Sequence, residues 1–183
     1  MKDIADHIFD ILENSVNANA TEIEVILKFF NKLFFCKIKD NGKGIKDKNV
    51  IDPFVTSRKE RRIGLGLPLL KRTAEETGGF LKISKLKGHG TILEFKINFS
   101  HIDSKPFGNI SETFVDAMLC WPDVNVEILL EIEKNKKVNI FNSKKILEII
   151  SYSELQEKEI RNFICCTIDQ ELERVGINTQ FGK

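Results

Sequence analysis

The order of periodic patterns in the first hundred residues limits the fold more than any other feature of the chain. One helical pattern is followed by two runs rich in β-branched and aromatic residues, and after a polar, glycine-bearing stretch the same helix–strand–strand unit returns. Covering one face of a sheet with helices buries the apolar side of both units, so we predict a two-layer α+β fold. The expected helices are 3–17 and 64–78, and the expected strands are 21–30, 33–39, 80–86 and 91–99.

The second part of the chain has a different charge. Residues 1–100 carry 18 basic and 13 acidic side chains, and residues 101–183 carry 10 and 14, which leaves +1 for the whole chain. We therefore predict two domains, 1–100 and 101–183. The second is an α+β extension that either docks a partner or simply enlarges the core. Its expected elements are a connector over 101–109, helices over 110–120, 143–150 and 153–175, and strands over 124–132 and 136–141.

Composition and segment lengths exclude several classes of protein. With 42% hydrophobic and 30% charged residues the chain is typical of a globular protein. It has no apolar run long enough to span a bilayer, and acidic residues interrupt the N-terminal apolar stretch, so we expect no membrane segment, no signal peptide and a cytoplasmic location. The four cysteines lack C-x-x-C spacing, and we expect reduced, mostly buried thiols. The acidic second half disfavours nucleic acid as a partner.

Three polar residues share one side of the first predicted helix. Asp10 and Asn14 are four residues apart and therefore neighbours on one face, with Glu13 beside them. A carboxylate can orient a nucleophile, and an amide oxygen can ligate Mg²⁺. A merely solvated face is the competing interpretation. His7 lies on the same face, and we interpret it as a surface polar position without a special role.

Two glycine-bearing segments flank the polar stretch. Asp40, Gly42 and Gly44 follow a strand, where they form either a simple turn or a loop that lets a planar ligand approach, with Asp40 accepting from an amino group. Gly64-Leu65-Gly66 begins a helix, whose N–H groups and dipole favour phosphate. Arg58 and Arg62 lie just upstream, and a basic loop closing over a polyphosphate would act as a lid.

In this order the motifs resemble the GHKL superfamily of ATP-binding domains, which includes DNA gyrase, mismatch-repair ATPases, heat-shock chaperones, histidine kinases and anti-sigma-factor kinases. The resemblance spans residues 4–99. Segment 12–23 is similar to the N box, especially in its mismatch-repair form, and places Asn14 at the magnesium-ligand position. Asp40-x-Gly42-x-Gly44 resembles the first glycine box, whose aspartate binds the adenine amino group.

The later motifs continue this resemblance. Segment 52–57 resembles the opening of the ATP lid, and Gly64-Leu65-Gly66 resembles the second glycine box. Thr91 takes the position of a threonine that assists adenine recognition. The resemblance thus implies the Bergerat fold, a two-layer α/β sandwich with a mixed sheet, and ATP and Mg²⁺ as ligands.

The chain departs from the family pattern at two positions. Arg62 stands where histidine kinases usually have a further glycine, and Asp10 stands where the hydrolysing and serine-kinase branches have glutamate. Water and a serine hydroxyl need a base. We therefore take Asp10 as the catalytic carboxylate, with Glu13 in reserve. The basic lid residues would offset charge in the transition state.

Three functions remain open from the sequence. The chain is expected to be a stand-alone Mg·ATP-binding protein that hydrolyses ATP or transfers its γ-phosphate to a separate partner in a regulatory role. Too few residues precede the N box to hold the acceptor histidine of a histidine kinase, so any phosphoacceptor is expected on another protein. The alternative is a non-catalytic, ATP-gated protein-binding module. Homodimerisation is left open, and a DNA-repair role ranks last.

Overall fold

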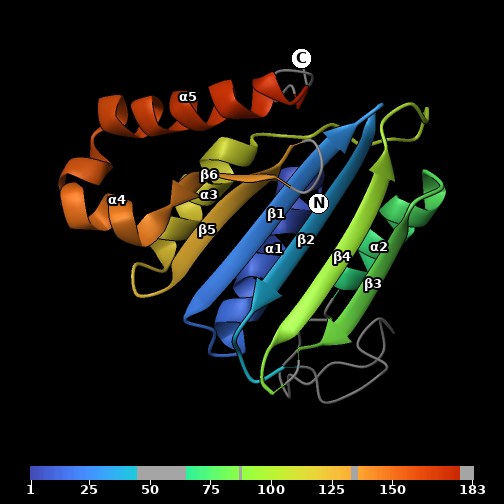
Figure 1. Ribbon diagram of the computed structural model, residues 1–183, viewed down its shortest axis with the longest axis horizontal. Helices are drawn as coiled ribbons and strands as arrows, with labels where there is room; N and C mark the ends of the chain where they lie inside the picture. Colours follow the sequence, from blue (N-terminus) through green and yellow to red (C-terminus); the bar gives the residue numbers. More distant parts are fainter. Residues whose placement is uncertain (45–64, 87, 133–135, 178–183) are drawn as a thin grey trace.

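The computed structural model describes residues 1–44, 65–86, 88–132 and 136–177 (Figure 1). Helices and strands alternate in the predicted order, and most bounds agree with the prediction to within one or two residues. In chain order the elements are α1 (Ile4–Asn17), β1 (Glu22–Phe30), β2 (Leu33–Asp40), α2 (Gly66–Glu76), β3 (Phe80–Lys85), β4 (Thr91–Asn98), α3 (Ile110–Cys120), β5 (Asn125–Glu131), β6 (Lys137–Asn142), α4 (Ser143–Ile149), the 3₁₀ turn η2 (Glu154–Gln156) and α5 (Lys158–Arg174).

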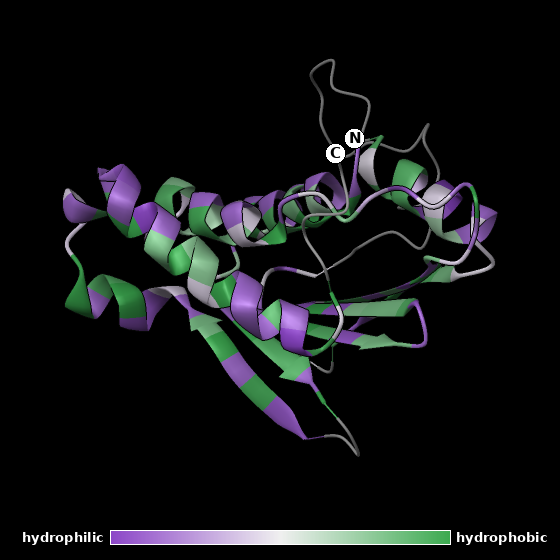
Figure 2. Cartoon of the chain, turned by 90° about the horizontal axis from the view of Figure 1, so that it is seen from above, coloured by the Kyte–Doolittle hydropathy of each residue, from purple (hydrophilic) through white to green (hydrophobic). Residues whose placement is uncertain are grey.

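A single mixed sheet organises the molecule. Its strand order is β3-β4-β2-β1-β5-β6, in which β1 pairs antiparallel with β2 and parallel with β5. Helix α1 packs between α2 and α3, and seen from above the helices form a layer over one side of the sheet (Figure 2). The α+β fold, with two layers and helices on one face, is therefore confirmed.

The two faces of the sheet differ in chemistry, as the alternation of side chains requires. Along β2 the even-numbered residues 34 to 40 are buried and the odd-numbered ones are partly exposed. The other face carries cross-strand ion pairs, including Lys37–Glu94 at 2.8 Å and Lys28–Glu131 at 2.7 Å. One face therefore holds the core and the other is solvated.

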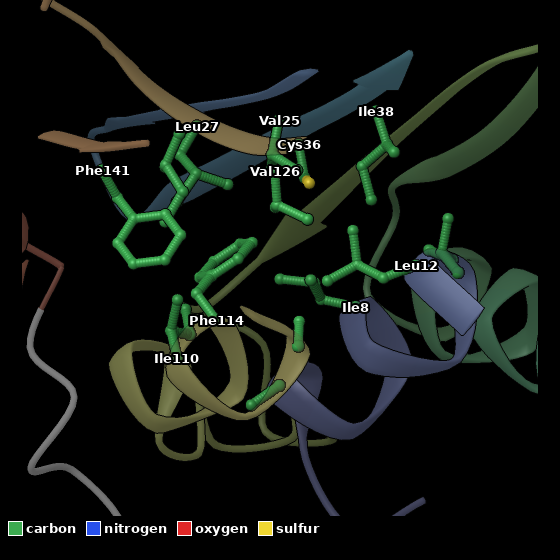
Figure 3. Packing of buried hydrophobic residues seen from close by; sticks show 14 of the residues in the cluster. Ile8, Leu12, Val25, Leu27, Cys36, Ile38, Ile110, Phe114, Val126 and Phe141 are labelled. Atoms are coloured by element: carbon green, nitrogen blue, oxygen red, sulfur yellow. The ribbon is translucent and has the colours of Figure 1, made fainter. Parts of the chain in front are cut away.

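The core is continuous across both halves of the chain. Side chains of α1, α3 and the sheet meet between the two layers (Figure 3). Strand β5, from the acidic second half, lies directly beside β1 from the basic first half. The described residues before and after position 100 thus share one sheet and one core. Contributors labelled in the figure include Ile8, Leu12, Val25, Leu27, Ile110, Phe114, Val126 and Phe141.

The connector between the two halves closes over the start of α1. Ile4 N donates to Pro106 O at 3.1 Å and Ala5 N to Phe107 O at 2.9 Å. Asp3 caps the helix by accepting from Asp6 N. The first N–H groups of α1, which have no partner inside the helix, are satisfied in this way. The helix that carries Asp10 and Asn14 is therefore fixed at its start by the second half of the chain.

Two sequence predictions need correction. The helical stretch expected over 153–175 is divided, because Glu157 takes an extended conformation between η2 and α5. The thiols are not mostly buried: Cys36 lies in the core, but Cys120 and Cys166 are exposed. Cys120 is the last residue of α3, and Cys166 lies off the core-facing side of α5, which is formed by Ile164, Ile168 and Leu172.

No helix in the described part of the chain combines the length and the apolar character that a membrane-spanning segment needs.

Candidate functional site

The polar side of α1 holds a hydrogen-bonded carboxylate–amide pair. Asn14 Nδ2 donates to Asp10 Oδ2 at 3.0 Å, as the spacing of four residues predicts. Asp10 is half-buried, whereas Asn14 is exposed. Because the NH₂ group of Asn14 points at Asp10, its carbonyl oxygen Oδ1 is the atom turned toward other ligands. Glu13 is exposed on the same helix.

The first turn of α2 lies against this pair. Gly66 is the first residue of α2, and a Cβ atom placed on it would lie 1.8 Å from Asp10 Oδ2. The carboxylate of α1 and the N-terminus of α2 are therefore in direct contact, and a larger residue at position 66 would have to displace the Asp10 side chain. Leu65, at the N-cap position and 46% exposed, has no polar side chain with which to cap the helix. The start of α2 thus presents N–H groups and a positive dipole end beside Asp10.

A second carboxylate lies at the end of β2. Asp40 is 7% exposed, and its Oδ1 accepts from Gly42 N at 2.9 Å and from Thr91 N at 3.2 Å. Its Oδ2 accepts from Ser15 Oγ at 3.2 Å. A carboxylate held by three donors is stable when buried and is oriented as an acceptor. This chemistry suits recognition of an amino group.

Close backbone contacts hold the loop after β2 against the end of α1 and the start of β4. Gly90, immediately before β4, has φ +106°, and a Cβ atom there would lie 2.0 Å from the carbonyl oxygen of Asp40. Lys43 N donates to Ala18 O at 2.8 Å, which ties the loop after β2 to the end of α1. Gly42 is buried in this loop, and Gly44 follows with φ +71°. Residues from α1, β2, the start of α2 and β4 thus meet at one end of the sheet.

Two residues of this region were missed as functional candidates in the sequence. Asn41 accepts at Oδ1 from Thr21 N (2.9 Å) and Glu22 N (3.0 Å), so it locks the loop after β2 to the start of β1. In the sequence, Asn41-Gly42 has the signature of a simple turn. Ser15 lies among the buried residues of α1, where the sequence pattern indicates only a core position. A buried carboxylate requires nearby hydrogen-bond donors, and the backbone N–H groups around a tight loop require acceptors. This requirement is the signal that could have identified Ser15 and Asn41.

Of the remaining candidate residues, the structure describes Thr91 but not Arg58, Arg62 and Gly64. Thr91, the first residue of β4, reaches Asp40 through its backbone N–H. Arg58, Arg62 and Gly64 lie outside the described residues, as does the rest of the segment predicted to form a lid.

His7 is not the surface position that the sequence suggested. It is 1% exposed, and burial together with the charge of Lys105 lowers its pKa to about 4. Lys105 Nζ lies 3.4 Å from His7 Nε2. The imidazole is therefore neutral and packed beneath the connector. The helical spacing gave the wrong prediction for His7, because the connector, about a hundred residues later in the chain, covers this side of α1.

The fold and this site together define an ATP-binding domain. The family described as histidine kinase-, DNA gyrase B- and HSP90-like ATPase matches residues 2–101, more than half of the chain, and the chain belongs to this family.

Two individual relatives that the chain resembles are sensor proteins. It is 30% identical over 101 residues to the sensor histidine kinase LiaS of Bacillus subtilis (strain 168), covering 52% of this chain and 25% of LiaS. It is 31% identical over 91 residues to a putative sensor protein of Shewanella frigidimarina (strain NCIMB 400), covering 46% of this chain and 14% of that protein. The chain thus spans a quarter or less of the length of these relatives.

A solved structure extends the likeness in fold beyond the family segment. The N-terminal domain of a DNA repair protein superposes with a TM-score of 0.52 at 16% identity, and covers 85% of this chain and 56% of that domain. This share is larger than residues 2–101 alone could supply, so the shared fold includes part of the second half of the chain.

Proposed function

We propose that the chain binds Mg·ATP across the end of the sheet where α1, β2 and α2 meet. Asp40 accepts a hydrogen bond from the adenine amino group, and the start of α2 takes the phosphates. Asp10 then lies beside the γ-phosphate. The support for this arrangement is that one buried carboxylate is oriented by three donors, while the other contacts a helix N-terminus.

The side chains of this site fit magnesium. Asn14 turns its Oδ1 outward because its Nδ2 is bonded to Asp10, and an amide oxygen is a suitable ligand for a hard cation. Among the described residues, no group of three or more His, Cys, Asp or Glu is placed to hold a metal ion by itself. Mg²⁺ usually relies on one or two protein oxygens together with phosphates and waters. When bound, the ion would offset phosphate charge.

Asp10 is the proposed catalytic residue. The observation that carries this assignment is its position: Oδ2 lies 3.0 Å from Asn14 Nδ2 and against Gly66, at the junction of the metal ligand and the phosphate-binding helix. There a carboxylate can orient water or a hydroxyl toward the γ-phosphate. Glu13 is the reserve base, and Arg58 and Arg62 would offset charge as the lid closes.

The reaction proposed is hydrolysis of ATP or transfer of its γ-phosphate to a separate protein, in a regulatory role. The likeness to a sensor histidine kinase and to a putative sensor protein supports a signalling context. The described residues after position 100 share the sheet and core of the site, so a partner bound to them could respond to the nucleotide through the packed layers.

A non-catalytic, ATP-gated binding module is the second candidate. One observation favours it: Asp10 is one methylene shorter than the glutamate of the hydrolysing branches, and its carboxylate is held against Gly66. A carboxylate held in this position extends less far toward an attacking water than the longer side chain of glutamate would.

One labelling experiment separates these functions. The chain is incubated with γ-labelled Mg·ATP, with and without candidate partner proteins. Label in free phosphate indicates an ATPase, acid-stable phosphoserine a serine kinase, and acid-labile phosphohistidine a histidine kinase. Binding without any transfer indicates the gated module. Asp40→Asn serves as the matched control, because it should weaken ATP binding by removing the carboxylate that accepts from the adenine amino group. Absence of ATP binding by the wild type would overturn the nucleotide assignment.

A further inference from the structure

Ser15 occupies a buried position on α1, beside the carboxylate of Asp40. It follows Asn14 on α1, but because successive helical residues diverge by about 100° it faces the sheet rather than solvent. Its side chain is 5% exposed, and Oγ donates to Asp40 Oδ2 at 3.2 Å. A serine here therefore links the helix that carries Asn14 to the carboxylate at the end of β2.

The three donors act unequally on the carboxylate of Asp40. Two backbone N–H groups, from Gly42 and Thr91, both bind Oδ1, whereas the bond to Oδ2 comes from Ser15. A carboxylate held at one oxygen can pivot about that oxygen. Held at both, it has a fixed plane, and its open lone pairs point in fixed directions. Ser15 therefore sets the orientation of Oδ2.

We propose that Ser15 is a positioning residue for purine recognition, which fixes Asp40 Oδ2 so that it accepts from a 6-amino group and repels a 6-oxo group. This inference rests on the proposed nucleotide site. An acceptor-only carboxylate matches the amino group of adenine and opposes the carbonyl of hypoxanthine or guanine. Loss of the serine hydroxyl lets the carboxylate turn or take up water, and the discrimination weakens.

Ser15 is expected to affect binding of the purine base and not binding of the metal. Ser15 contacts Asp40 through its side chain, while the neighbouring Asn14 bonds Asp10 on a different side of α1. Replacing Ser15 should therefore change nucleotide affinity by the same factor with and without Mg²⁺. A general disturbance of α1 would instead change the magnesium dependence as well.

The test measures ADP and IDP binding to the full chain by titration calorimetry, with and without Mg²⁺. Ser15→Ala should weaken ADP about tenfold and leave IDP nearly unchanged. Only ADP donates to the Asp40 carboxylate, and this bond to a charged group is weakened when the carboxylate can turn. The ratio of the two affinities, measured on one preparation, is independent of the fraction of folded protein. Ser15→Thr keeps the hydroxyl and should restore most of the ratio.

Two further variants give the controls. Ser111→Ala removes another fully buried serine hydroxyl, which bonds Asn109 far from the site, and should leave the ratio at the wild-type value. Asp40→Asn should abolish the preference for ADP, and Ser15→Ala should then change nothing further.

The outcomes separate the two proposals. Suppose that the wild type prefers ADP, that Asp40→Asn removes this preference and that Ser15→Ala retains it. The role proposed for Ser15 is then wrong, and the nucleotide site stands. The role is also wrong if Ser15→Ala weakens ADP and IDP equally. If the wild type binds neither nucleotide, the proposed function itself fails.

Discussion

Gly66→Ala tests the contact on which the catalytic assignment depends. The new methyl group would lie 1.8 Å from Asp10 Oδ2 and 2.5 Å from Asp10 Cγ, where ordinary contact begins at 3.4 Å. The carboxylate or the start of α2 must therefore move by about 1.6 Å. Such overpacking costs about 1–3 kcal/mol. Replacing glycine in a helix returns about 0.5–1 kcal/mol, so the net loss should be about 0–2.5 kcal/mol.

The assay is urea unfolding of four proteins: wild type, Gly66→Ala, Asp10→Ala and the double variant. If the loss comes from the clash with Asp10, removing the carboxylate relieves it. Gly66→Ala should then be neutral or slightly stabilising in the Asp10→Ala background. The free energies of unfolding should show a coupling of about 1–3 kcal/mol between the two positions, with the m-value unchanged.

Additivity would refute this reasoning. If Gly66→Ala costs the same free energy with and without the Asp10 carboxylate, the two residues are not in contact, and the phosphate end of α2 does not meet the catalytic face of α1. ATP turnover provides a second readout. The double variant should regain the stability of the fold without regaining turnover.

Three further changes have expected outcomes. Asp10→Asn should lower ATP turnover by about 10²-fold or more, whereas Glu13→Gln should stay within about twofold; the reverse pattern would reassign the base. Phe114→Ala, at a fully buried position, should cost about 3–5 kcal/mol in one cooperative unfolding transition, and two transitions would contradict the shared core. Unfolded His7 binds protons more readily than folded His7, so stability should fall by about 1–2 kcal/mol from pH 6.5 to 4.5, a loss that His7→Leu should remove.

Local signals explain why the elements were predictable. Asp3 caps α1, and Asn31 and Lys32 both take positive φ, as the tight hairpin between β1 and β2 requires. Gly78, with φ +70°, ends the turn after α2. Each of these depends on residues within a few positions of one another, and a sequence displays such relations directly.

Contacts between distant residues were not predictable in the same way. The bond from Ser15 to Asp40 joins positions 25 residues apart, and the burial of His7 depends on Lys105 in the connector. The pairing of β5 with β1 depends on which edge of the first hundred residues is open, and the periodic pattern of a strand carries no information about its neighbour. The motifs predicted which residues would gather, whereas the donors that orient them emerged only from the fold.

The position of β1 between β2 and β5 has a consequence for how the chain is made. Residues 125–131 leave the ribosome long after β1, and until they do so β1 is an uncovered edge with apolar side chains and unpaired backbone groups. Parallel pairing across about a hundred residues is entropically slow. We expect the nascent chain to remain prone to association until β5 has emerged. For the same reason, a fragment ending at residue 100 should express poorly, although it contains almost the entire family segment.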